Sequence, residues 1–482
     1  MDVDPKDANL EDPLSRHPTL LKYHKLLVQM TRDSRNDSAA QLLHLQNLCH
    51  LFSDALIIQL ENNYKAVLDK LERDCHFTKA VHRAIASNPA HPRVCSLGLR
   101  ILAHMASIFP STINAELIFQ HDCLTTAVDV LRTHASTDVS TLRSALCLLT
   151  TLLGCRINHS SAVIKFQRIP MIGPTLNTII KQNMDDATTI EWGLAACSYV
   201  GNYGGRNLLE TICQALSTHP TDLGIVRASL SALCSLARIK MHQIVLIGCG
   251  IFKLIRSLLD LRPATRDVSI KACILITSLL QCEQGRESFM RNSSIGKSGN
   301  RKSIKSGSNG ERLVQLISDC LPSYGEIALS SFALSMRCVL NALTMIALSS
   351  DQARTLLMHR CQTADILEQF LELKLPTVRL RFDIEMALAA VNGEVEEEAK
   401  ANLFKEMDNG GSGGGDFNLS SSLKISRGQV MKPTKNQNGV IVSGEKKGLL
   451  LGFESCLWWL VSSLLSPAFC SCIFSFSFLY NN

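Results

Sequence analysis

The sequence predicts an all-α protein, a right-handed α-solenoid (superhelix) of about six to eight helical repeats. Three observations predict it: a recurring phrase, breaks between helical stretches, and the lack of an alternating strand pattern of useful length. The phrase is a charged residue followed by small and aliphatic residues at helical spacing, as in VRASLSALCSLA from Val226 and LRSALCLLTTLL from Leu142. A period of about 40–47 residues with helices in every unit is typical of a solenoid.

The charged residue of the phrase marks the register of the repeats. Successive markers are 50, 48, 36, 44, 66 and 42 residues apart. The markers are Arg93, Arg143, Glu191, Arg227, Lys271, Arg337 and Arg379.

Two interpretations of these markers stay open. They form a basic ladder that binds an acidic segment of a partner, or their long stems cover apolar surface while the charge reaches a neighbouring repeat. On the first interpretation, the candidate partner-binding residues are Arg143, Trp192, Arg227, Lys271, Arg337 and Arg379.

Composition agrees with thin helical layers. A chain of 482 residues exceeds what one compact core usually serves, so a single domain has to be elongated or repetitive. Charged residues make up 19% and aromatic residues 5%, so Leu, Ile, Ala and Val have to fill the core. The net charge of +6 is mild and the basic residues are scattered, so we expect no nucleic acid partner.

The 18 cysteines contain no C-x-x-C pair, which argues against a zinc ribbon or a redox dithiol. We expect them to be buried free thiols in a reducing compartment. The sequence has no phosphate-binding G-x-x-x-x-G-K-[ST] loop, no H-E-x-x-H and no G-x-S-x-G. We therefore expect no catalytic, metal or cofactor-binding residues, and an enzyme with a hidden site is the interpretation that we favour least.

The N-terminal region precedes the repeats. Residues 1–18 are acidic and rich in Asp and Pro, and we expect a disordered lead-in. They have no apolar stretch behind a positive start, so we expect no secretory signal and a cytoplasmic protein. Residues 19–86 are predicted to form a helical cap, because apolar side chains recur every three or four residues in Leu42–Leu60.

The predicted repeats cover residues 87–391, beginning at the two prolines of Ser87–Arg93. Later breaks lie near Pro110, at Arg168–Pro174, and around Pro220, Pro263 and Pro376. Residues 292–312 are rich in Gly, Ser, Asn and Lys and form a flexible insertion. Basic residues precede Ser303 and Ser306, which makes these serines candidates for phosphorylation; the alternative is a tolerated insertion with solubilising charge.

Two stretches carry a family resemblance. Ile169–Pro170 and Ile172–Gly173 resemble the Gly-x-I/L-P turn of armadillo repeat proteins, and the stretch from Gly248 repeats that phrase without the proline. The resemblance covers roughly Ser87 to Val391. It implies three helices per unit, with the third helix lining a concave groove.

One departure limits what the resemblance implies about function. Armadillo carriers of extended peptides present Trp and Asn four residues apart on the groove helix. Here Trp192 is followed four residues later by Ala196, and Asn341 has no tryptophan near it. A peptide groove of that specific kind is therefore not expected.

After the repeats, residues 392–448 are predicted to be an acidic and then Gly/Ser/Lys-rich disordered linker, and residues 449–482 a hydrophobic C-terminal tail. Within the acidic part, we expect Gly393–Met407 to be a short helix end that forms the solvated cap of the solenoid. Ser455–Leu479 is a run of 25 residues without a charge, long enough at ~1.5 Å per residue to cross a ~30 Å hydrocarbon layer. The run is either a transmembrane anchor or a gene-model artefact. The scattered serines and Pro467 count against the anchor.

The sequence thus favours a non-enzymatic scaffold or adaptor that binds a helical or extended segment of another protein along the groove. The alternative is a tail-anchored adaptor that uses the same groove at a membrane through residues 455–479.

Overall fold

The computed structural model describes residues 37–53, 76–108, 113–155, 159–261, 266–291, 309–321, 330–372 and 377–409. Over these ranges every regular element is a helix and there is no strand, which confirms the all-α prediction. Ser303, Ser306, the lead-in 1–18 and the tail 449–482 lie outside the described residues. Within the described part of the chain, no helix is both long enough and apolar enough to span a bilayer.

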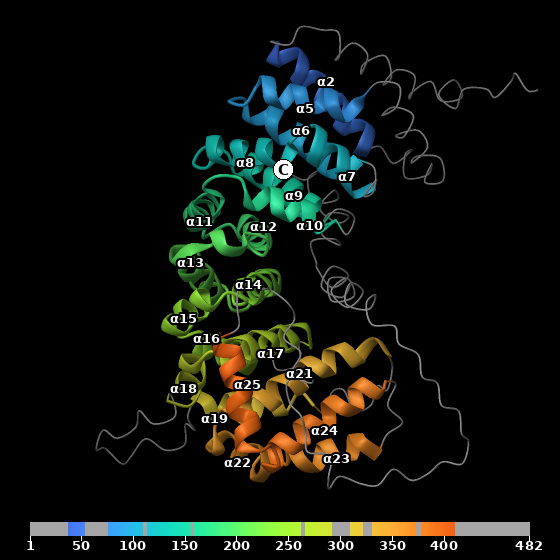
Figure 1. Ribbon diagram of the computed structural model, residues 1–482. Coiled ribbons are helices and arrows are strands. Elements are labelled where there is room, and N and C mark those ends of the chain that lie inside the picture. Colours follow the sequence, from blue (N-terminus) through green and yellow to red (C-terminus); the bar gives the residue numbers. More distant parts are fainter. Residues whose placement is uncertain are drawn as a thin grey trace, which may run out of the picture. The chain divides into compact units, whose positions relative to one another are not determined.

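The chain divides into two compact units between Tyr203 and Gly204, and each is described by itself (Figure 1). In the described part of unit 1, the first helices are α2 (Ser38–Ser53), α5 (Phe77–Ser87) and α6 (Pro92–Ile108). The next repeat comprises α7 (Ile113–Ala115), the π-helix η2 (Glu116–Gln120), α8 (Cys123–His134) and α9 (Val139–Gly154). The last comprises α10 (His159–Gln167), α11 (Ile172–Gln182) and α12 (Ala187–Cys197), followed by the 3₁₀ turn η3 (Gly201–Tyr203).

Unit 2 continues the pattern of a short first, a second and a third helix. It begins with a pair, α13 (Gly205–Thr218) and α14 (Leu223–Leu236). Three full repeats follow: α15 (Lys240–Gly248), α16 (Ile251–Leu261) and α17 (Arg266–Leu280); α18 (Glu283–Arg291), α19 (Asn309–Ser318) and α21 (Ser330–Ser349); α22 (Asp351–His359), α23 (Thr363–Glu372) and α24 (Val378–Asn392). Among the described helices, α25 (Glu397–Asn409) follows α24.

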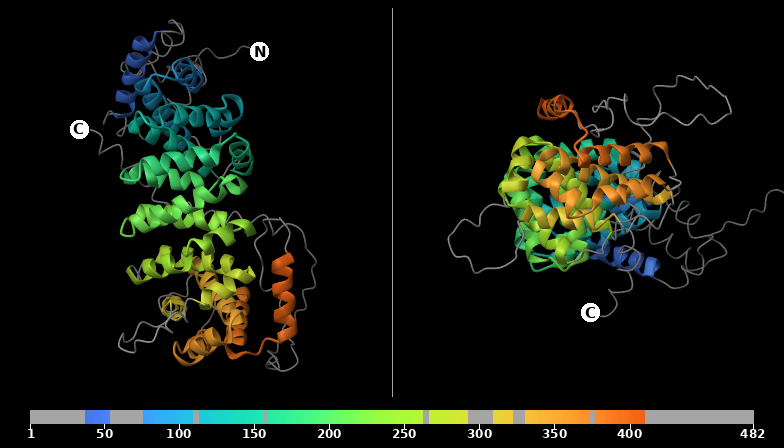
Figure 2. Two further views of the ribbon diagram at one scale, coloured as in Figure 1. Left: turned by 90° about the vertical axis from the view of Figure 1, so that its left-hand side faces the viewer. Right: turned by 90° about the horizontal axis from the view of Figure 1, so that it is seen from below.

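The third helices pack side by side in chain order, α6 on α9 and α9 on α12 in unit 1, and α14, α17, α21 and α24 in unit 2 (Figures 1 and 2). The pair α13 and α14 has no first helix of its own, because only the single turn η3 precedes it. This missing helix accounts for the short 36-residue step between the markers Glu191 and Arg227.

A left-handed backbone residue precedes the second helix of most repeats. Four of these residues are not glycine: His76, Asp122, Met171 and Gln362, with φ between 46° and 57°. Gly250 takes the same place before α16, with φ of 74°. The positive φ reverses the chain between two helices within one residue, although it disfavours any side chain with a Cβ.

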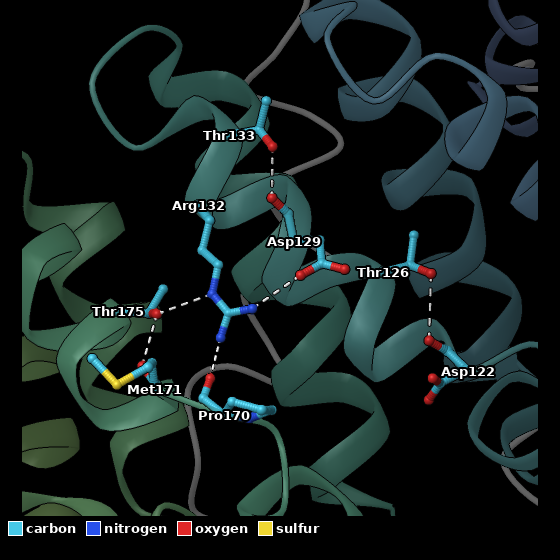
Figure 3. A network of polar contacts seen from close by, with 8 residues as sticks. All are labelled: Asp122, Thr126, Asp129, Arg132, Thr133, Pro170, Met171 and Thr175. Carbon is cyan, nitrogen blue, oxygen red and sulfur yellow. Dashed lines mark hydrogen bonds and ion pairs between the residues drawn. The ribbon is translucent and has the colours of Figure 1, made fainter.

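The turn that resembles the armadillo phrase is held by the preceding repeat (Figure 3). The guanidinium of Arg132 on α8 donates to the carbonyl oxygen of Pro170, and its Nε lies 3.4 Å from Oγ1 of Thr175 on α11. Asp129, one turn before Arg132, holds the same guanidinium at 3.0 Å. Because one side chain contacts the turn and the helix after it, the second helices α8 and α11 keep a fixed register.

Burial of small thiols is a regular feature of the core. The cysteines whose side chains the structure describes are free, and most of them are buried among Leu, Ile, Ala and Val. Burial raises the pKa of Cys95 to about 11 and that of Cys338 to about 12. These thiols therefore stay protonated at neutral pH and pack as small apolar groups.

The acidic segment after the repeats forms a helix, as expected for the helix end at Gly393–Met407, but this helix is not fully solvated. Residues 397–409 form the helix α25, in which Leu403 and Met407 are buried. They lie four residues apart and so share one face of the helix, a pattern too short to stand out in the sequence.

Candidate functional site

The candidate site is the solvent-facing side of the third helices, which we call the third-helix face. On most of them, half-buried or exposed positions recur every three or four residues, while the positions between them are buried; on α21, residues 342–348 are all buried. Several side chains on this face are small: Cys147 and Thr151 on α9, Ser231 and Ser235 on α14, and Ser278 on α17. The marker residues stand near the N-terminal end of this face.

In unit 1, Arg143 pairs with a carboxylate of the following repeat. Its Nη2 lies 2.5 Å from Oδ1 of Asp186 and its Nε 3.1 Å from Oδ2, a two-point contact between α9 and the start of α12. Asp186 is also the N-cap of α12 and accepts a hydrogen bond from the backbone N–H of Thr189.

These contacts decide the ionisation of Asp186. Burial alone would raise the pKa of the carboxyl, but hydrogen bonds from Arg143 and Thr189 outweigh it and hold the pKa below its ordinary value. The carboxylate is thus ionised at neutral pH, and it holds the Arg143 side chain of α9 against the start of α12.

In unit 2, Arg227 on α14 pairs with a carboxylate of the following repeat through one ion pair, in which neither atom forms a hydrogen bond. Its Nε lies 2.9 Å from Oδ2 of Asp267, the second residue of α17. Lys271, one turn later on α17, lies 3.8 Å from the same oxygen and donates back to Oγ of Ser231 on α14 at 2.7 Å. Burial lowers the pKa of Lys271, and the neighbouring Asp267 opposes that shift.

Arg337 on α21 makes the third contact of this kind. Its Nε donates to Oδ2 of Asp383 on α24 at 2.6 Å, and the two side chains are 22% and 8% exposed. Asp383 is therefore almost fully removed from water, and its charge is compensated by the preceding repeat.

The remaining marker residues take different positions. Arg93 is exposed at the start of α6, while Glu191 and Arg379 are half-buried. Trp192 is buried on α12, with 8% of its surface exposed. The contact of the predicted residues with a partner stays a prediction.

Sequence reasoning missed the carboxylate partners Asp186, Asp267 and Asp383. The signal was present, because each follows its arginine by one repeat length: 43 residues for Arg143 and 46 for Arg337. A search for an acidic residue one repeat length after each basic marker would have found all three aspartates.

The third helices of unit 2 carry more basic than acidic residues, so their net charge is positive. These helices, α14, α17, α21 and α24, carry six basic residues and three acidic ones.

In the described part of the chain, no group of three or more His, Cys, Asp or Glu residues could hold a metal ion.

This architecture, with a short first helix, a left-handed turn and stacked third helices, defines the class: an all-α solenoid of armadillo-like repeats. No family model and no curated protein matches the chain. Among solved structures, an engineered protein has 14% identity and a TM-score of 0.42, covering 56% of this chain and 98% of its own.

Two further solved structures are designed armadillo repeat proteins. One has 15% identity and a TM-score of 0.33, covering 63% of this chain and 94% of its own. The other, solved in complex with the peptide (KR)4, has 14% identity and a TM-score of 0.32, covering 61% and 92%. At such scores the class rests on the helices of this chain itself.

Proposed function

We propose that the protein is a non-enzymatic scaffold that binds an acidic segment of another protein along the third helices of unit 2. The observation that carries the proposal is the excess of basic over acidic residues on α14, α17, α21 and α24. The internal ion pairs hold Arg227 and Arg337 in fixed positions, so a partner would meet pre-organised charges.

The small side chains between these charges favour the same function. Ser231, Ser235 and Ser278 leave the face shallow, which would let a backbone approach the helices closely and exchange hydrogen bonds with hydroxyl groups. Arg227, Lys271, Arg337 and Arg379 are the basic contacts we propose on unit 2.

The test adds opposing charge to the face and leaves the ion pairs intact. Peptides selected from a random library on the immobilised full chain should be rich in Asp and Glu. The double variant Ser278→Glu/Asn341→Glu should weaken their binding about tenfold or more, because like charges then face each other. The matched control, Ser257→Glu/Gln369→Glu, places the same charges on exposed positions of the second helices α16 and α23 and should change binding less than about twofold.

Two results would reject the proposal: selected binders without acidic enrichment, or equal loss of binding in both double variants.

The second form of the function, a membrane-tethered adaptor, is supported by the uncharged run Ser455–Leu479. Alkaline extraction of cells that express the full chain or a chain ending at Met407 tests it. Retention of only the full chain in the membrane pellet supports the anchor, and release of both chains rejects it.

A further inference from the structure

The helix α25 does not belong to any repeat. It follows α24 after a short connection in which Gly393 takes the left-handed conformation, with φ of 76°, and ends α24. In Figure 2 it stands outside the stacked helices of unit 2 in both views. The chain thus turns back along unit 2 instead of adding another layer.

A single ring contact identifies where α25 lies. The guanidinium of Arg286, on the first helix α18, is 4.1 Å from the ring centroid of Phe404. This is the geometry of a cation–π contact, and it joins residues 118 positions apart in the sequence. Arg286 is itself held in place, since its Nη1 donates to the carbonyl oxygens of Leu280 and Gln281 at the end of α17.

The face of α25 that carries Phe404 is the apolar one. Leu403 is 1% exposed and Met407 is 9% exposed, whereas Asn402 and Lys405 on the opposite face are exposed. The helix also begins with Glu397 and Glu398, where acidic side chains suit the positive end of the helix dipole. An acidic amphipathic helix thus has two buried apolar side chains and contacts a fixed cation of unit 2 through Phe404.

We propose that the surface of unit 2 around Arg286 is a docking site for an acidic amphipathic helix, and that α25 occupies it in cis. A partner protein would bind there by presenting Leu, Phe and Met at the spacing of Leu403, Phe404 and Met407, after displacing α25. This site is distinct from the third-helix face, and the two proposals stand independently.

Because α25 belongs to the same chain as the site, it competes with any helix that binds there from another molecule. A segment tethered by a few residues has an effective concentration in the millimolar range. A helix added in trans therefore binds weakly until α25 is released, and α25 tunes the affinity of the site.

The test uses the full chain and a labelled synthetic peptide with the sequence of residues 397–409. The double variant Leu403→Asp/Met407→Asp should release α25, and the peptide should then bind at least tenfold more tightly than it binds the unmodified chain. The control Asn402→Asp/Lys405→Gln makes the same change in charge on the opposite, exposed face of α25, and this variant should bind the peptide as weakly as the unmodified chain does. A peptide carrying Phe404→Ala should lose at least fivefold in affinity for the released variant.

Equal binding to all three chains, or no binding to any, would overturn the proposal. Hydrogen exchange on the unmodified chain tests it without a substitution. Excess acetylated peptide, distinguishable by its mass, should speed exchange of the chain's own residues 397–409, and an unchanged rate would overturn the proposal. The variant Ser278→Glu/Asn341→Glu should leave peptide binding unchanged, so this site and the third-helix site can fail separately.

Discussion

The ion pair between Arg337 and Asp383 offers a direct measure of how one repeat stabilises the next. At 2.6 Å, two unit charges attract by about 6 kcal/mol at an effective dielectric constant of about 20, and desolvation offsets much of this. A charge-assisted hydrogen bond contributes about 1.5–3 kcal/mol net. We therefore expect a coupling energy of about 2 kcal/mol between the two side chains.

Arg337→Met alone should cost about 3 kcal/mol, because it keeps most of the stem but leaves the carboxylate of Asp383, 8% exposed, without its cation. Asp383→Asn alone should cost less, and the double variant should cost about 2 kcal/mol less than the sum of the two. Urea unfolding followed by circular dichroism gives the free energies, and native-state hydrogen exchange shows whether the loss lies in α21 and α24.

The control pair is Arg381–Glu385 on α24, whose side chains are 60% and 44% exposed at an N–O distance of 3.2 Å. Its coupling energy should stay within about 0.5 kcal/mol, as for other exposed pairs four residues apart. If both cycles gave the same small coupling, the reasoning that burial gives the inter-repeat pair its strength would be refuted.

Three further predictions concern the backbone, the packing and the pH dependence. Met171→Gly should raise the free energy of unfolding by about 1 kcal/mol, because Met171 has φ of 57° and an exposed side chain, while Met171→Val should lower it; thermal melts that rank the two the other way contradict this. Gly285→Ala should destabilise unit 2 by more than about 3 kcal/mol, since the new Cβ would lie 1.8 Å from the oxygen of Leu279, whereas Gly248→Ala, with nothing within 4 Å, should cost less than about 0.5 kcal/mol in the same urea titration. Asp186 has a lowered pKa in the folded state, so its contribution to stability is present above its unfolded pKa of about 3.9 and is lost as the pH falls through the folded value. The melting temperature of Asp186→Asn should therefore fall less between pH 5 and about pH 3 than that of the unmodified chain, and parallel curves would contradict the assignment.

The helices and their breaks could be predicted because local chemistry sets them. The prolines of Ser87–Arg93 and Arg168–Pro174 lie where helices end and begin, and the apolar spacing of the recurring phrase matches the third helices. The short step before Arg227 also had a local cause, the replacement of a first helix by one 3₁₀ turn.

The missed features depend on residues far apart in the sequence. Nothing near Arg337 shows that Asp383 will lie beside it, because that proximity depends on how far the intervening helices advance the chain. The left-handed positions at Met171 and Gln362 carry side chains that disfavour the conformation, so propensity alone points away from them. The docking of α25 through Phe404 and Arg286 was hidden for the same reason.

The buried thiols can serve as probes of local unfolding in individual repeats. Burial raises the pKa of Cys95 on α6 to about 11, that of Cys213 on α13 to about 12 and that of Cys338 on α21 to about 12, so none is an effective nucleophile while its helix is closed. An alkylating reagent can then react with each only when its own repeat opens. Mass spectrometry of the labelled sites would time the opening of each repeat separately in the unmodified protein.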